Sequence, residues 1–346
     1  MSDRQLNESL EIPTKESHLM APYRHICRQQ GKNIRAKFVA AFNSWIRLSP
    51  ASEATINEIV GMLHNASLLV DDIEDGATLR RGQPVAHEIF GTALTLNCAN
   101  HMYFTALAKV MQLVEAPPAE RAATADIKAA AQAELVKAYT TELQELHIGQ
   151  GLDIYWRDTF TVPTLEQYEG MVLQKTGGLF RLSLKLMLAM RRYEQAVCSP
   201  PAASANQMHL TPEKERELVG LVNSFSLLFQ ILDDYLNLKS AGYHKNKSFC
   251  EDLQEGKFSF CITHSIQTAK ESNNGDCRLF HALRQRPKTE EMKLFCVDLM
   301  EETGTFAFCR EKLATLKTEI LAKIEHLGGN EQLAECLTGL LALGEL

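Results

Sequence analysis

The chain has 346 residues, 45% of them hydrophobic, which is enough apolar material for one large domain or two smaller ones. A net charge of −7 argues against a broadly basic surface of the kind that binds nucleic acid or anionic membranes. The nine cysteines are widely spaced and form no CxxC pair, so they favour neither a zinc site nor a disulfide framework and indicate a reducing compartment.

The first residues mix acidic and polar side chains, so we expect a flexible N-terminal arm over residues 1–20 rather than a targeting peptide. No stretch approaches 18 uninterrupted apolar residues, and we therefore expect no stable membrane insertion and a cytoplasmic location. Residues 21–346 are expected to form a single domain.

Apolar residues recur at steps of three and four along most of the chain, which is typical of helices with one buried face. The pattern covers residues 51–75, 92–114, 119–149, 164–193, 212–238 and 286–326. Helix-breaking segments separate these stretches at residues 82–84, 116–118, 162–163 and 198–207. Strand-like alternation is scarce. The sequence therefore predicts one all-α domain, a bundle of roughly ten or more helices.

The clearest feature of the sequence is the segment 68–75, LLVDDIED, in which an apolar helix ends in four carboxylates. Asp71 and Asp75 are four residues apart, so on a helix they project from one face. One interpretation is a solvated helix end. Like charges at this spacing repel, however, and carboxylates at a helix C-terminus oppose the helix dipole, so we favour a bound cation.

A second segment, FQILDDYLN at residues 229–237, repeats the arrangement after another apolar helix, with Asp233 and Asp234 followed by Asn237. Two such helices can face each other across a bundle. Buried carboxylates are costly without a cation, so the two segments indicate a metal site. Oxygen ligands suit Mg²⁺, which usually binds one or two carboxylates together with substrate phosphates. The sequence therefore predicts a diphosphate substrate.

Basic residues stand where they can meet such a substrate. Lys32 and Arg35 follow Gly31, and Arg80 and Arg81 follow the first aspartate segment. Residues 174–178 (QKTGG) interrupt an apolar helix, where we expect a kink and a close backbone approach. They lack the order of a P-loop, which argues against nucleotide binding.

Three lysines, at 245, 247 and 257, surround the segment CEDL at residues 250–253, which we interpret as part of a flexible loop closing over the site. Each lysine taken alone is typical of an ordinary surface residue, and their order after the second aspartate segment favours a role at the site. His64 lies seven residues before Asp71 on one helix face. It is either a phosphate ligand or a core histidine.

In these motifs the chain resembles the trans-prenyl diphosphate synthases, and among them most closely the animal-type geranylgeranyl diphosphate synthases. The resemblance rests on ordered segments from GKNIRAKF near residue 31 to LRQR near residue 283: MLHNASLLVDDIEDGATLRRGQPVAH, ELHIGQGLDIYWRD, MVLQKTGGLF, FQILDDYLNL and NKSFCEDLQEGKFSF. It implies an all-α isoprenoid-synthase bundle with a deep central cavity and a homodimer or higher homo-oligomer.

The implied reaction is a head-to-tail (1'-4) condensation of isopentenyl diphosphate with an allylic diphosphate (dimethylallyl, geranyl or, most of all, farnesyl), with up to three Mg²⁺ ions. The resemblance assigns metal binding to Asp71, Asp75 and Asp233, supported by Asp72 and Asp234. It assigns the allylic diphosphate to Arg80, Lys175 and Lys247, with Lys257 nearby, and isopentenyl diphosphate to Gly31, Lys32, Arg35, His64 and Arg81. Thr176 and Gln230 are assigned to the reacting carbons.

Product length depends on the cavity wall. Ala66 and Ser67 are small and leave room for a growing chain, and the resemblance puts the cavity floor at Tyr103, Phe104 and His147. We therefore expect a geranylgeranyl product, with a geranyl or farnesyl product as the alternative. The family commonly has Asn, Tyr, Arg and Pro where this chain has Gly76, His101, Leu232 and Cys261, and His101 is expected to alter the cavity wall.

Two other classes of protein share this fold. A terpene synthase needs a second metal motif of the form (N/D)Dxx(S/T)xxxE, but here Asn237 and Ala241 stand where the Ser/Thr and the Glu are required. A non-catalytic regulatory subunit can lose its aspartates without losing its fold, whereas both aspartate segments are present here.

Overall fold

The computed structural model describes residues 18–28, 34–115, 125–197, 210–239, 249–272 and 275–344. Almost all of the predicted arm of residues 1–20 lies outside them. The described elements are α2 (Ala21–Cys27), α3 (Ile34–Ile46), α4 (Pro50–Glu74), β1 (Leu79–Arg80), β2 (Gln83–Pro84), α5 (Ala86–Phe90), α6 (Thr92–Gln112), η1 (Leu113–Glu115), α7 (Ala125–Thr159), α8 (Leu165–Val197), α9 (Pro212–Lys239), α10 (Glu251–Glu255), α11 (Phe260–Glu271), α12 (Arg278–Arg284), α13 (Glu290–Glu302), α14 (Thr305–His326), α15 (Glu331–Leu341) and η3 (Ala342–Gly344).

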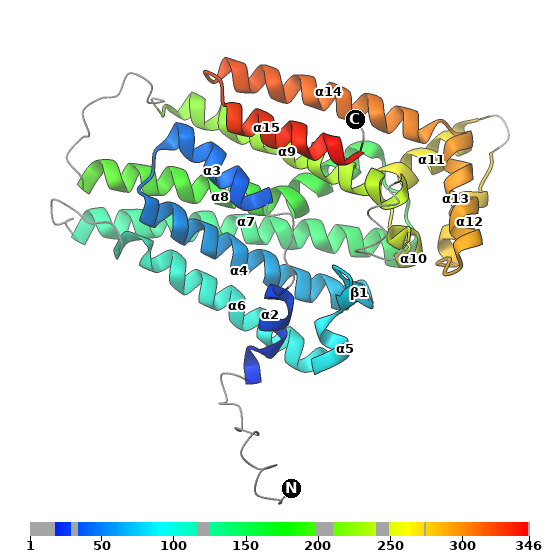
Figure 1. Ribbon diagram of the computed structural model, residues 1–346, viewed down its shortest axis with the longest axis horizontal. Coiled ribbons are helices and arrows are strands. Elements are labelled where there is room, and N and C mark those ends of the chain that lie inside the picture. Colours follow the sequence, from blue (N-terminus) through cyan, green and yellow to red (C-terminus); the bar gives the residue numbers. More distant parts are fainter. Residues whose placement is uncertain are drawn as a thin grey trace, which may run out of the picture.

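The long helices form a bundle around α8, and the all-α prediction is confirmed. α8 packs against α3, α4, α7 and α9, and Figure 1 shows its long axis running between α7 and α9. Leu182, Leu186 and Met190 have no exposed surface. Because neighbouring helices cover α8 on several sides and most of its residues from Gly177 onwards are buried, α8 lies at the centre of the hydrophobic core.

Helix starts follow the local sequence. Ser49 caps α4 by accepting a hydrogen bond from the Ser52 amide, and Pro50 occupies the first helical position, where its missing amide hydrogen is not needed. Thr211 caps α9 in the same way, with Pro212 after it. The loop predicted at residues 162–163 joins α7 to α8. The loops predicted at 116–118 and 198–207 lie outside the described residues.

Three predictions about secondary structure are wrong. The stretch 286–326 forms two helices, because the chain turns at Gly304, whose φ of 68° is accessible mainly to glycine. Residues 251–255, expected to belong to a flexible loop, form the short helix α10. Residues 82–84, expected to form a loop, belong to an antiparallel two-stranded hairpin over residues 79–84, in which Arg80 pairs with Gln83.

The C-terminal ends of α4, α7 and α9 lie towards one end of the bundle, together with α10 (Figure 1). The polar segments of the sequence therefore meet there. Elsewhere in the bundle α3 packs against α15, and the Asn330 side chain donates a hydrogen bond to the Ala41 carbonyl. Within the described residues, no helix combines the length and the apolar character needed to cross a membrane. None of the described cysteines forms a disulfide.

Candidate active site

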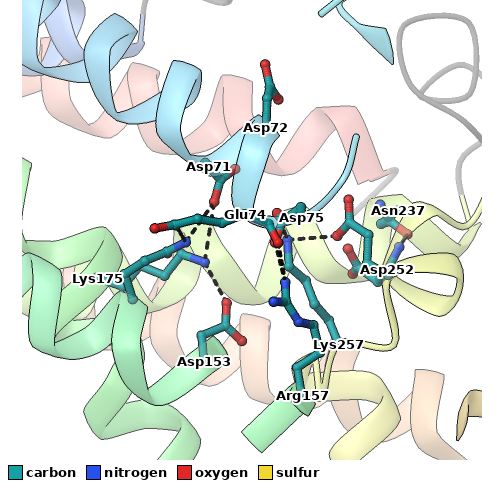
Figure 2. Close-up of polar contacts among 12 residues, drawn as sticks. Asp71, Asp72, Glu74, Asp75, Asp153, Arg157, Lys175, Asn237, Asp252 and Lys257 are labelled. Atoms are coloured by element: carbon teal, nitrogen blue, oxygen red, sulfur yellow. Dashed lines mark hydrogen bonds and ion pairs between the residues drawn. The ribbon is translucent and has the colours of Figure 1, made fainter. Parts of the chain in front are cut away.

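The last turn of α4 points its aspartates in two directions (Figure 2). Asp71 and Asp75 face α7 and α8, whereas Asp72 points away and is 2% exposed. The Arg80 guanidinium donates to Asp72 Oδ1 at 2.7 Å and to Asp71 Oδ2 at 3.2 Å. Asp72 therefore holds Arg80 beside the site, and this position favours the supporting role over direct metal binding.

Each carboxylate oxygen of Asp75 has a cation. Arg157 Nη1 donates to Oδ1 at 2.9 Å, and Lys257 Nζ donates to Oδ2 at 2.5 Å. Lys257 also contacts Glu255 Oε2 at 2.7 Å. Burial raises the pKa of Asp75, although Lys257 opposes the shift. Burial lowers the pKa of Lys257, but Asp75 and Glu255 raise it by more, so it lies well above its usual value.

The C-terminal part of α7 contributes Gln150, Asp153 and Arg157, which lie three and four residues apart on one helix face. Gln150 Nε2 donates to Glu74 Oε2 at 2.7 Å and to Asp71 Oδ1 at 3.2 Å. Sequence reasoning assigned none of these side chains, although the segment ELHIGQGLDIYWRD contains them. The available signal was this polar spacing on a helix that must bury one face.

Lys175 of α8 places a cation beside the carboxylates of the site. Its Nζ lies 2.6 Å from Asp153 Oδ2 and 3.8 Å from Asp71 Oδ1. Burial alone would raise the pKa of Asp71, but Lys175, with Lys257 and Arg80, lowers it well below the usual range of an aspartate. Asp71 is therefore ionised at every physiological pH and suited to bind a cation.

The helix interruption that was predicted at residues 174–178 is not found, because α8 continues through these residues. The predicted close approach is present. A Cβ added to Gly149 of α7 would lie 2.4 Å from the Lys175 amide nitrogen, and one added to Gly178 would lie 3.1 Å from Leu146 Cβ. The Leu173 carbonyl accepts a hydrogen bond from Arg181 Nη1 at 2.5 Å. The two glycine contacts bring the Lys175 region of α8 against α7.

The two carboxylates of the second aspartate segment have different surroundings. Asp233 lines the cavity, whereas Asp234 accepts a set of hydrogen bonds. Asp234 is 5% exposed and accepts from Tyr168 Oη at 2.5 Å, the Phe260 amide at 2.7 Å and Gln230 Nε2 at 2.8 Å. Thr176 Oγ1 donates to Gln230 Oε1 at 2.6 Å. Asp234 therefore orients Gln230 and through it Thr176, and this favours its supporting role.

Asn237, the last residue of the second aspartate segment, is buried and hydrogen-bonded to the chain beyond α9. It is 3% exposed, and its Oδ1 accepts a hydrogen bond from the Asp252 amide at 3.3 Å (Figure 2). This contact attaches the start of α10 to α9. Asn237 thus positions the segment that carries Lys257.

Two arginines and a histidine form a second polar group in the cavity wall. Arg35, His64 and Arg81 all line the cavity, and Arg35 Nε is buried without a hydrogen-bond partner among the described residues. Burial, followed by the nearby arginines, holds the pKa of His64 well below its usual value, so this histidine is neutral. Burial also lowers the pKa of Arg35 to about 10, with Arg81 adding to the shift. The buried Nε of Arg35, which has no hydrogen-bond partner among the described residues, favours an anionic ligand.

The cavity has a volume of about 1350 Å³ and brings together most of the predicted residues. Its lining includes Arg35, His64, Ser67, Asp71, Arg80, Arg81, Tyr103, His147, Lys175, Thr176, Gln230, Asp233, Asp234 and Lys257. Gly31, Lys32, Lys245 and Lys247 lie outside the described residues. Asp72 and Asp75 are not among the lining residues, whereas Arg80 and Lys257, which contact them, are.

Three residues that were expected at the cavity wall lie elsewhere in the structure. Ala66 is fully buried in the core and lines no part of the cavity, Phe104 is 73% exposed on α6, and His101 is exposed on the same helix. Tyr103 and His147 do line it, with ring centroids 5.7 Å apart.

The donors fit a metal that is completed by its substrate. Among the described residues, no group of three or more His, Cys, Asp or Glu side chains is arranged to hold a metal ion. The cavity does offer Asp71 and Asp233, both oxygen ligands. Because Mg²⁺ commonly takes one or two carboxylates and fills its remaining positions with water and phosphate oxygens, this set suits Mg²⁺ better than a metal that needs a complete protein cage.

A deep cavity with carboxylates, lysines and arginines at one end of an all-α bundle defines a site for a phosphate-bearing, metal-bridged ligand. The sequence matches the family described as polyprenyl synthetase over residues 16–300, and the chain belongs to this family. The trans-prenyl part of the sequence resemblance is thereby confirmed.

The relatives are similar over nearly the whole chain. A geranylgeranyl pyrophosphate synthase of Aspergillus flavus is 42% identical over 328 residues, which cover 95% of this chain and 84% of the relative. Geranylgeranyl pyrophosphate synthase 1 of Zymoseptoria tritici is 40% identical over 327 residues, 93% and 86% of the two chains. A protein named terpene synthase from Matsumurasca onukii is 41% identical over 326 residues, 94% of each chain. The animal-type part of the resemblance stays a prediction.

Proposed function

We propose that the chain is a Mg²⁺-dependent geranylgeranyl diphosphate synthase that condenses isopentenyl diphosphate with an allylic diphosphate, with farnesyl diphosphate as the preferred starter. The observation that carries this proposal is one cavity that holds Asp71 and Asp233 beside lysines and, separately, cations around Arg35. Two such regions suit two diphosphates. The relatives named as geranylgeranyl pyrophosphate synthases support the choice of product.

At the first region the chain binds the leaving diphosphate. Bound Mg²⁺, up to three ions, supplies the positive charge that stabilises the departing diphosphate. Asp71, Asp75 and Asp233 are the proposed ligands. Arg80, Lys175 and Lys257 bind the diphosphate oxygens, together with Lys247. The carbon–oxygen bond of the allylic substrate breaks, the double bond of isopentenyl diphosphate attacks the allylic cation, and the released diphosphate takes up the proton that is lost.

Thr176 and Gln230 act at the reacting carbons. The Thr176 hydroxyl uses its only proton to donate a hydrogen bond to Gln230 Oε1, and the Gln230 amide donates to Asp234. The remaining lone pairs of Thr176 Oγ1 are therefore free to face a positive charge. Since Thr176 lines the cavity beside Lys175, its oxygen is well placed to stabilise the allylic cation.

The second region binds isopentenyl diphosphate. Arg35 has a buried donor without a partner in the described structure, His64 is neutral, and Arg81 lines the same wall. A bound diphosphate gives Arg35 Nε a hydrogen-bond partner and brings negative charge to the wall that Arg81 lines. Gly31 and Lys32 belong to this region by sequence.

The wall formed by Tyr103 and His147 is the proposed limit on chain length. Tyr139 Oη donates to the Tyr103 carbonyl at 2.5 Å, which fixes the backbone of this wall, and His147 Nδ1 is hydrogen-bonded to the Leu143 carbonyl at 2.7 Å. Ser67 offers little bulk on the way to it.

Incubation of the protein with Mg²⁺, isopentenyl diphosphate and farnesyl diphosphate tests the proposal. We expect geranylgeranyl diphosphate as the main product by chromatography and mass spectrometry. Products that stop at ten or fifteen carbons would contradict the chain length while leaving the reaction class intact. No metal-dependent turnover would instead support the regulatory-subunit alternative.

Replacement of Asp71 tests the metal assignment. We predict that Asp71→Ala lowers turnover by several orders of magnitude, because it removes a cavity-lining ligand whose pKa keeps it ionised. Circular dichroism and thermal unfolding are expected to show an intact fold. A variant with normal turnover at limiting Mg²⁺ would rule out the metal role of Asp71.

A terpene synthase is the second candidate, and the relative from Matsumurasca onukii is the observation in its favour. The second metal motif of that class is absent here, since Asn237 positions α10 and Ala241 replaces the required Glu. Release of a linear or cyclic hydrocarbon from geranyl, farnesyl or geranylgeranyl diphosphate would favour this candidate and overturn the first.

We further propose a homodimer and a cytoplasmic location, with residues 21–346 acting as one domain. The described cysteines are free thiols, as a reducing compartment allows. α6 and α7 pack together and present large exposed apolar side chains: Leu96, Phe104, Met111, Ile148 and Tyr155. A second copy of the chain is the proposed cover for these residues.

A further inference from the structure

Arg157, near the C-terminal end of α7, is a buried charged residue to which the proposed reaction assigns no role. It is 8% exposed. Its Nη1 donates to Asp75 Oδ1 at 2.9 Å and to the Glu74 carbonyl at 3.1 Å, and its Nε donates to Asp158 Oδ1 at 2.9 Å. One guanidinium therefore joins the last turns of α4 and α7 (Figure 2).

The end of α4 needs a cation from outside. Its last turn contains no basic residue, and it carries several carboxylates where the helix dipole is already negative. The final carbonyls of a helix also have no partner within the helix. Arg157 satisfies the Glu74 carbonyl and neutralises Asp75 with the same Nη1. It thereby fixes both the backbone and the side chain at this point.

The two cations on Asp75 differ in how easily they can leave. Lys257 lines the cavity, its side chain is 18% exposed, and Glu255 offers its ammonium a second partner. Arg157 sits on the 35-residue helix α7, does not line the cavity and has three acceptors. A planar guanidinium held at several points loses little entropy per bond and exchanges reluctantly.

We infer that Arg157 is a positioning residue for metal binding: it fixes Asp75 through Oδ1, so that Oδ2 is the atom that exchanges the ammonium of Lys257 for a divalent cation at the cavity. Lys257 then turns to the incoming diphosphate or to Glu255. The identity of the metal rests on the proposed function. The contacts of Arg157 do not.

The test measures metal binding and not turnover. Full-length wild type, Arg157→Gln and Arg157→Lys are titrated with Mn²⁺ in the presence of inorganic pyrophosphate, by calorimetry and by electron paramagnetic resonance. Loss of an outer-shell partner typically weakens metal affinity about 10–100-fold, and we expect a loss in this range for Arg157→Gln. Arg157→Lys is expected to fall between, because one ammonium cannot hold both Asp75 and the end of α4.

Controls separate positioning from general stability. Arg286→Gln removes a neighbouring arginine that lies 4.0 Å from Asp158 Oδ1, whereas the ion pairs of Asp75 within the described residues are with Arg157 and Lys257, so wild-type affinity is expected. In an Asp75→Asn background, Arg157→Gln is expected to cause little further loss, since both changes act on one carboxylate. Circular dichroism and the unfolding midpoint report whether each variant is folded.

Wild-type Mn²⁺ affinity in a folded Arg157→Gln protein overturns the inference, and so does a fully additive loss in the Asp75→Asn background. Should Arg157→Gln not fold, wild-type affinity in Arg157→Lys overturns it equally. The proposed function is tested separately. A protein that makes no prenyl diphosphate but binds Mn²⁺ in a way that depends on Arg157 would contradict the proposed function and leave the inference intact.

Discussion

His64 is a neutral base held among positive charges. Burial and then the neighbouring arginines keep its pKa well below its usual value of 6.5. A bound diphosphate brings negative charge to the same wall and offsets the arginines, so it raises the pKa of His64. The residue therefore links the protonation of the protein to the binding of its anionic substrate.

The lowered pKa of His64 fixes the direction in which the stability of the folded protein depends on pH. Above pH 6.5 His64 is neutral in both the folded and the unfolded chain and adds no pH dependence. As the pH falls below 6.5, only the unfolded chain takes up the proton, so the folded state loses up to about 1.4 kcal/mol per pH unit from this one group. We predict that His64→Gln loses less stability than wild type between about pH 6.5 and pH 5.

Urea unfolding at several pH values measures this difference. Calorimetry in two buffers of different ionisation enthalpy is expected to show proton uptake when pyrophosphate binds near pH 6, in wild type but not in His64→Gln. His101→Gln, on the exposed surface of α6, is the matched control and should behave as wild type. Equal pH dependence in wild type and His64→Gln would mean that His64 is an ordinary core histidine.

Single residues also mark the limit of sequence reasoning about the site. The aspartates and lysines were identifiable because charge is costly in an apolar helix. The cavity wall was not, because neighbouring residues of a helix differ by about 100° in direction. Ser67 and Tyr103 face the cavity, whereas their neighbours Ala66 and Phe104 face the core and the outer surface. Sequence spacing alone does not fix this rotation.

At the level of elements, the site depends on how closely α7 and α8 approach. Gly149 lies against the backbone of Lys175, and Gly178 lies against Leu146. Lys175 reaches Asp153 and Asp71 from this contact. Added volume between the two helices therefore moves the lysine relative to both carboxylates.

We predict that Gly149→Ala destabilises the protein by about 1–3 kcal/mol, the usual cost of overpacking, and weakens pyrophosphate binding. An added Cβ would lie 2.4 Å from the Lys175 amide nitrogen, a backbone atom that cannot move aside cheaply. Gly151→Ala, on the same helix with nothing within 4 Å of an added Cβ, should be neutral or stabilising by about 0.5–1 kcal/mol. Urea midpoints with unchanged slopes provide the comparison. Equal effects of the two variants would exclude the close packing as the cause.

The long helices were predictable because their apolar stripes extend over many turns, as in α4, α8 and α9. Short elements were not. α10 has five residues and depends on Asn237 for its first turn, and the 79–84 hairpin is stabilised by tertiary contacts such as that of Arg80 with Asp72. Periodicity cannot detect an element that is shorter than two turns or held by distant residues.

In the whole molecule, whose net charge is −7, the charged side chains are unevenly distributed. Cations of α3, α8 and the 79–84 hairpin gather at one cavity, next to the carboxylates of α4 and α9. The apolar surface shows the same segregation, with large exposed side chains on α6 and α7. Phe104, at 73% exposed, is the extreme case. A second copy of the chain that covers this side chain would remove its apolar surface from water.

We predict that Phe104→Glu weakens self-association by about 2 kcal/mol or more, roughly thirtyfold in Kd, because a large central aromatic is a typical interface anchor and a buried unpaired carboxylate opposes assembly. Sedimentation equilibrium over a range of concentrations measures the change. Phe295→Glu, on α13 at 39% exposed in wild type, is the control and should leave the mass distribution unchanged. If Phe104→Glu keeps the wild-type mass at low concentration, or if wild type is itself a monomer, α6 and α7 do not form the interface and Phe104 serves some other contact. A monomeric variant that still makes geranylgeranyl diphosphate at the wild-type rate would show that the cavity is complete within one chain, as its lining by residues of a single chain leads us to expect.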